Sequence, residues 1–135
     1  MRELEGPAAM VAAVGELIGM SRFVELGERD VRLYNESVGA EPSESTVPEG
    51  LIVARTASLM MELIVVAGRK FGLNYGIDDV RLDEILIGSR IRLRLVLAEC
   101  EMRDEHTVDA AWAIGVEVDG RGAVGGFTAR TRYIF

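Results

Sequence analysis

The chain has 135 residues, the usual size of one domain, which excludes two independent domains. Hydrophobic residues make up 49% of it, which is enough for a packed core and excludes general disorder. Fifteen basic and 22 acidic residues give a formal net charge of −7, which disfavours nucleic acid and anionic membranes as partners. The single cysteine, Cys100, and single histidine, His106, can form neither an internal disulfide nor a zinc site, which favours a cytoplasmic protein without metal.

The first third of the chain is predicted to be helical. Residues 1–15 lack the basic region and long apolar core of a secretion signal. Residues 8–17 are rich in Ala, Val and Leu without proline, and Asp30 can cap a short helix over residues 31–38 that Gly39 ends. Residues 40–49 read Ala-Glu-Pro-Ser-Glu-Ser-Thr-Val-Pro-Glu, a polar stretch with two prolines that is typical of a loop.

A long helix is predicted over residues 50–71. Apolar side chains occupy nearly every helical angle in this segment, so most of its surface must be buried. Arg55 and Glu62 interrupt the apolar part and are costly at membrane depth, which favours a helix inside the protein over a membrane span. We therefore expect other elements to enclose this helix.

Three strands are predicted to follow. Residues 90–101 alternate between apolar and polar with period two, and residues 107–118 repeat the pattern around Trp112. Asp119-Gly120 then supplies a hairpin turn into a third strand over residues 122–134. Short turns make this an antiparallel sheet, and helices followed by strands indicate the α+β class.

Three stretches match the pattern of a known family. They are residues 14–21 (Val-Gly-Glu-Leu-Ile-Gly-Met-Ser), residues 33–39 (Leu-Tyr-Asn-Glu-Ser-Val-Gly), and residues 73–82 (Leu-Asn-Tyr-Gly-Ile-Asp-Asp-Val-Arg-Leu) with 87–92 (Ile-Gly-Ser-Arg-Ile-Arg). Together they resemble the MaoC-like family, in its NodN-like subgroup, and the second is similar to its FAxxTGD run. The resemblance covers residues 1–135 as one domain. It implies a hotdog fold, an antiparallel sheet wrapped around a long central helix, and dimers whose sheets join edge to edge.

The resemblance also implies (R)-specific enoyl-CoA hydratase or hydroxyacyl-thioester dehydratase chemistry, but the residues for it differ here. The family uses an aspartate and a histidine in the loop before the central helix, which hold a water and move a proton. Ala40 stands at the aspartate position and Glu44 falls at the histidine position, while the glycine before the helix is retained as Gly50. His106 lies in a predicted turn between strands, where a histidine is usually solvated. We therefore expect a degenerate hydratase site.

Six residues are candidates for the altered site. Gly50 can present a backbone amide to a thioester or ketone oxygen, or it is only the glycine of a tight turn. A loop glutamate pressed against an apolar pocket can have a raised pKa and act as acid or base, although most are merely solvated. Asn74 and Tyr75 either line the pocket or form a turn. The candidate catalytic residues are Glu44, Gly50 and Glu41, and the candidate substrate-binding residues are Glu49, Asn74 and Tyr75.

Three functions remain open, and the first is favoured. The chain is a repurposed lyase, isomerase or cyclase of secondary metabolism that acts on an acyl or polyketide-like substrate without a cofactor. Alternatively it is a non-catalytic partner subunit of an active (R)-enoyl-thioester hydratase or dehydratase, or a conventional hydratase with an unrecognised base. We expect a homodimer in the first case and association with a full hydratase in the second.

Overall fold

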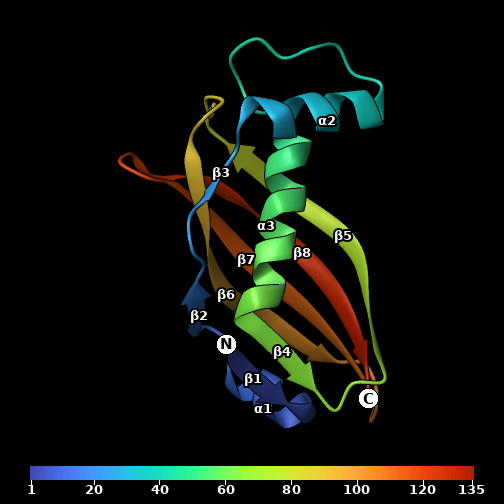
Figure 1. The fold of residues 1–135 in the computed structure, drawn as a ribbon. Helices are drawn as coiled ribbons and strands as arrows, with labels where there is room; N and C mark the ends of the chain where they lie inside the picture. The colour runs from blue at the N-terminus through green and yellow to red at the C-terminus, as the bar shows by residue number, and fades with distance from the viewer.

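The computed structural model describes residues 1–135, and Figure 1 shows one long helix lying across a curved antiparallel sheet. The helices are α1 (Gly6–Ala12), α2 (Glu28–Val38) and α3 (Glu49–Leu63), and the strands are β1 (Arg2–Glu5), β2 (Leu17–Met20), β3 (Val24–Glu25), β4 (Ile64–Ala67), β5 (Phe71–Leu82), β6 (Arg90–Met102), β7 (Thr107–Val118) and β8 (Gly122–Ile134). The main sheet has the order β2-β6-β7-β8-β5, with β3 also paired to β6. No helix is both long and apolar enough to cross a membrane. The predicted α+β class is confirmed.

Strands β6, β7 and β8 form the antiparallel core that the alternating pattern predicts. Ile91, Leu93, Leu95 and Leu97 of β6 are fully buried. They pair in register with Val118, Val116, Ile114 and Trp112 of β7, which are also buried. These side chains point toward α3 because alternate residues of a strand share one face. The predicted strands at residues 90–101, 107–118 and 122–134 are therefore confirmed.

Helix α3 is shorter and less enclosed than predicted. It ends at Leu63, and residues 64–67 form β4 instead, which pairs in parallel with β1. The cause is the β-branched run Ile64-Val65-Val66, which favours a strand once β1 offers hydrogen bonds. Only one face of α3 is buried, through Ile52, Thr56 and Leu59, while Met61 on another face is 74% exposed. The prediction of a helix over residues 50–71 that is buried on most sides is wrong.

The N-terminal elements also differ from the predicted bounds. The helix expected over residues 8–17 is α1, which ends at Ala12, and residues 17–20 form β2 on the edge of the sheet. Helix α2 starts at Glu28 because Asp30 lies inside its first turn, where its Oδ2 accepts the Gly27 N–H at 3.1 Å. Gly39 ends α2 in the left-handed conformation, with φ 68°, as predicted.

Strand β5 is the longest of the strands that sequence reasoning missed. Asn74 and Tyr75 lie within it, so of the two alternatives for these residues the turn is wrong. It pairs with β8 on one side, with an irregularity between Asn74 and Gly76, and it has no neighbour on its other side. Nearly all of its residues are exposed, including four alternating apolar side chains: Phe71, Leu73, Tyr75 and Ile77. The sheet thus ends in a long, unpaired and apolar edge.

Candidate functional site

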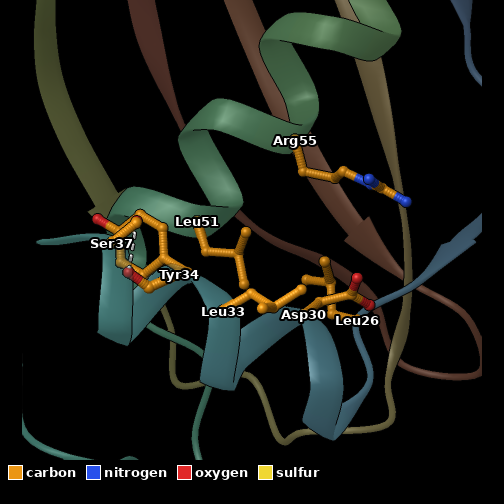
Figure 2. A pocket seen from close by; sticks show the side chains of 7 residues that line it. All are labelled: Leu26, Asp30, Leu33, Tyr34, Ser37, Leu51 and Arg55. Atoms are coloured by element: carbon orange, nitrogen blue, oxygen red, sulfur yellow. Dashed lines mark hydrogen bonds between the residues drawn. The ribbon is translucent and has the colours of Figure 1, made fainter.

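A cavity of about 300 Å³ lies where α2 crosses the first turns of α3 (Figure 2). Helix α2 contributes positions i, i+3, i+4 and i+7, which lie on one face of a helix. Helix α3 contributes two residues one turn apart, and one comes from the segment before α2. The lining residues are Leu26, Asp30, Leu33, Tyr34, Ser37, Leu51 and Arg55. Its walls are therefore largely apolar, with polar groups from both helices.

Gly50 lies directly against the side chain of Tyr34. A Cβ atom at position 50 would overlap the Tyr34 hydroxyl and lie 2.9 Å from the ring carbon that carries it. Gly50 does not have a positive φ, so a tight turn does not explain the glycine, whereas this close approach does. Its N–H belongs to the first turn of α3, at the positive end of the helix dipole, and has no backbone acceptor, whereas the amides of Leu51 and Ile52 donate to the Pro48 oxygen. The amide can thus serve as a hydrogen-bond donor to a ligand.

A second cavity, of about 390 Å³, lies on another face of α2, under the loop of residues 40–48. Asn35, which is buried, donates a hydrogen bond from Nδ2 to Ser43 Oγ at 2.9 Å and so ties the loop to α2. Sequence reasoning missed this pair. The signal was present, because Asn35 shares the buried face of α2 with Val31, one turn earlier. The lining residues are Glu28, Val31, Arg32, Asn35, Glu36, Ala40, Pro42, Ser43, Glu44 and Ile87.

The structure separates the candidate catalytic residues. Glu44 lines the second cavity, whereas Gly50 lies against Tyr34 of the first, so the two are not brought into one cavity. Glu41 and Glu49 line neither cavity and are exposed. Within a single chain, therefore, none of the three glutamates lies in the apolar surroundings that we expected for an active carboxyl.

The candidate binding residues of β5 lie away from both cavities. Asn74 Oδ1 accepts a hydrogen bond from Thr131 Oγ1 at 2.9 Å, and this pair ties β5 to β8. The ring of Tyr75 lies 5.6 Å from the guanidinium carbon of Arg132 and is 46% exposed. Both side chains belong to the unpaired edge of the sheet, so any ligand they contact must lie at that edge.

The histidine is far from the α2–α3 junction. The His106 side chain is 72% exposed, in the turn between β6 and β7, as expected. Its carbonyl oxygen accepts the Phe135 N–H at 2.7 Å, and Figure 1 places that C-terminus at the end of the sheet opposite α2. An imidazole of the same chain is therefore not available to a ligand in either cavity. No group of three His, Cys, Asp or Glu side chains is placed to hold a metal ion.

The strongest charge cluster lies near this same end. Asp109, with 7% of its side chain exposed, accepts hydrogen bonds from Arg132 Nε and Nη2, at 2.7 and 2.9 Å, and also from Arg103. These bonds, first those from Arg132, lower the pKa of Asp109 to about 2, against the opposing effect of its burial. The cluster joins the turn after β6 to β7 and β8, and none of its residues lines either cavity, so we interpret it as structural.

Comparison with known proteins gives both sequence relatives and structural neighbours, although no family model matches the chain. The chain is 30% identical to 3-hydroxyacyl-thioester dehydratase Z of Mycobacterium tuberculosis, over 89% of each chain. It is 26% identical to Nodulation protein N of Rhizobium leguminosarum bv. viciae, over 83% of this chain and 80% of that protein.

Solved structures show the same architecture. A monoamine oxidase regulatory protein from Archaeoglobus fulgius superposes with a TM-score of 0.78 at 14% identity, over 99% of this chain and 97% of that one. A hot-dog-like protein from Thermanaerovibrio acidaminovorans gives 0.60 at 10% identity, over 88% and 84%. An (R)-hydratase from A. caviae gives 0.62 at 10%, over 86% and 95%. The predicted hotdog fold is confirmed.

Proposed function

Because the chain belongs to the MaoC-like hotdog family of hydratases and dehydratases, we propose that it binds an acyl or polyketide-like substrate and transforms it without the Asp-His dyad. The reaction is a dehydration, isomerisation or cyclisation. The observation that supports this most is the α2–α3 cavity beside Gly50, combined with an imidazole at the far end of the sheet. A ligand site is retained while the usual proton-transfer group is not.

Gly50 supplies the part of the chemistry that does not need a side chain. Its amide, at the positive end of the α3 dipole, donates to the carbonyl oxygen of a thioester or ketone. Polarising that oxygen stabilises the negative charge that develops when a proton leaves the α-carbon. The shape of the cavity then selects which bond breaks or which ring closes, because it fixes the conformation of the chain.

Glu44 is the proposed acid or base. It is the one candidate glutamate that lines a cavity, beside the hydrogen-bonded pair of Asn35 and Ser43. Glu41 belongs to the same loop but lines no cavity, which ranks it below Glu44. Glu49, Asn74 and Tyr75 are proposed substrate contacts, the last two at the β5 edge. In a dehydration, Glu44 would take the α-proton of a substrate that reaches from the first cavity to the second, and would pass it to the β-hydroxyl, which leaves as water as the double bond forms.

The chain is proposed to work as a homodimer formed through β5. An unpaired edge of twelve residues with four exposed apolar side chains is a surface that native proteins normally cover. Pairing with β5 of a second copy continues the sheet and occupies the free backbone groups of this edge, beside Leu73 on one face and Ile77 on the other. A heterodimer with a complete hydratase is the alternative, and it would accompany the non-catalytic partner function.

Substitutions in the loop test the catalytic part of this proposal. Single-turnover assays would use a panel of enoyl and 3-hydroxyacyl thioesters and polyketide analogues. Glu44→Gln removes the ionisable group and nearly preserves shape, so the rate should fall by about 10²- to 10⁴-fold with unchanged thermal stability. Glu41→Gln is the matched control and should stay within a few-fold of wild type. If Glu44→Gln and Glu41→Gln both have small and equal effects on the rate, Glu44 is not the acid or base. Catalysis would then depend on the Gly50 amide and the shape of the cavity.

A further inference from the structure

The hydroxyl of Tyr34 is the polar group closest to Gly50 that is free to meet a ligand. It lies so close to Gly50 that a Cβ there would displace it, and the only side-chain hydrogen bond at Tyr34 involves its backbone oxygen and not the hydroxyl. Its neighbour Ser37 is already engaged, because Ser37 Oγ donates to the backbone oxygen of Tyr34 at 2.8 Å. The phenol therefore keeps its donor available at the wall of the cavity.

The two ends of the cavity differ in chemistry. Figure 2 shows Tyr34 and Ser37 at one end and Asp30 and Arg55 at the other, with leucines between them. Asp30 and Arg55 bring one negative and one positive charge, so they contribute no net charge to the cavity. The site therefore suits a neutral ligand with an apolar middle and a hydrogen-bond acceptor at the Tyr34 end. A neutral thioester or ketone fits this description better than a free carboxylate.

We propose that Tyr34 recognises the substrate carbonyl: its hydroxyl donates a hydrogen bond to the oxygen of a neutral acyl thioester or ketone bound in the α2–α3 cavity. The apolar carbon chain then lies on Leu26, Leu33 and Leu51. Together with the Gly50 amide, the phenol gives the oxygen two donors from the two helices. This inference rests on the proposed function, because it requires the cavity to be an acyl site.

A pair of probes that differ only in the carbonyl tests the hydrogen bond. S-hexanoyl-N-acetylcysteamine carries the thioester oxygen, and the thioether S-hexyl-N-acetylcysteamine lacks it. Their dissociation constants are measured by calorimetry with the wild type, Tyr34→Phe and Ser58→Ala. One net hydrogen bond corresponds to a factor of roughly 2 to 12 in affinity. The thioester preference of Tyr34→Phe should therefore be smaller than that of the wild type by this factor, with thioether affinity unchanged.

The controls separate this inference from the proposal on which it rests. Ser58→Ala removes a hydroxyl that makes an equivalent bond, to the Arg55 backbone oxygen at 2.9 Å, but lines neither cavity, so it should keep the wild-type preference. An unchanged preference in Tyr34→Phe, with both probes still bound, overturns the Tyr34 inference and leaves the acyl site intact. Failure of the wild type to bind either probe overturns both. If Tyr34→Phe does not fold, infrared spectra of the ¹³C-carbonyl thioester decide: bound to the wild type, its stretch should lie below the value in buffer, and an unshifted stretch overturns the inference.

Discussion

Strands β7 and β5 both have apolar residues at alternate positions, but the apolar side chains of β7 are buried and those of β5 are exposed. Strand β7 lies between β6 and β8, and its Trp112 and Val116 are fully buried. Strand β5 pairs with β8 alone, and its Leu73 and Ile77 remain half exposed. An alternating pattern therefore predicts a strand, whereas the burial of its apolar side chains depends on which elements cover the face and the edge of that strand. Strand β7 is covered within a single chain, whereas the free edge of β5 is where the proposed dimer would form.

A charged substitution on β5 is expected to have the largest effect, because it should prevent formation of the proposed homodimer. Leu73→Glu places a carboxylate on each copy at the edge, and burying it there costs several kcal/mol of association free energy. We expect light scattering to report a dimer for wild type and a monomer for Leu73→Glu at tens of micromolar. Leu86→Glu, at an equally exposed leucine outside β5, is the control and should remain dimeric. If the wild-type protein is a monomer, the proposed dimer through β5 is wrong.

In the part of the sheet around β7, the loss of the Asp109 carboxylate should lower the stability of the protein. Asp109→Asn removes charged hydrogen bonds to Arg132 and Arg103, which are worth about 1.5–3 kcal/mol. The lowered pKa of about 2, against an ordinary 3.8, means that this stabilisation is fully present above about pH 4 and is lost as pH falls toward 2. Urea unfolding across this range should show that step in wild type and not in Asp109→Asn.

An exposed ion pair provides the control for that experiment. Asp119 bonds Arg90 at 3.0 Å, but both side chains are about half exposed. Asp119→Asn should therefore cost less than about 1 kcal/mol, and it should keep the acid step. Equal losses for the two variants would show that burial of Asp109 between the strands carries no special stability.

The helical junction is also complete within the chain, and its tight contact should be measurable. Gly50→Ala forces a Cβ onto the Tyr34 hydroxyl and should cost about 1–3 kcal/mol by overpacking. Tyr34→Ala relieves the overlap, so in that background the same substitution should cost little, which is a non-additive pair. Thermal unfolding of the four proteins checks this. Additive effects would mean that the two residues do not touch.

The sequence predicted the parts of the fold in which a pattern and its burial agree. The period-two runs of β6 and β7 predicted both strands and the face of Trp112, because that face is buried within one chain. The pattern Phe71, Leu73, Tyr75 and Ile77 was equally regular, but intervening glycine and asparagine favoured a turn. The apolar run that continues through Ile64 predicted a longer helix, because no pattern in residues 2–5 predicted that they form β1 and pair with β4.

The candidate site was less predictable, because it depends on contacts between distant positions. The resemblance predicts that the Asp-His dyad is lost and that Gly50 is the retained glycine, and both remain predictions. Its close approach to Tyr34 could not be, since the two residues are 16 positions apart and meet only through the crossing of α2 and α3. Likewise, only the fold shows that Glu44 and Gly50 belong to different cavities.

Whether this protein works without an imidazole base can be measured with His106→Ala. The measurement is the rate of hydration of a short enoyl-CoA, or of the substrate found in the panel, by His106→Ala and wild type. We predict rates within a few-fold of each other, because His106 is a solvated turn residue at the far end of the sheet. A general base typically contributes about 10²- to 10⁴-fold, so loss of turnover on that scale would contradict the account.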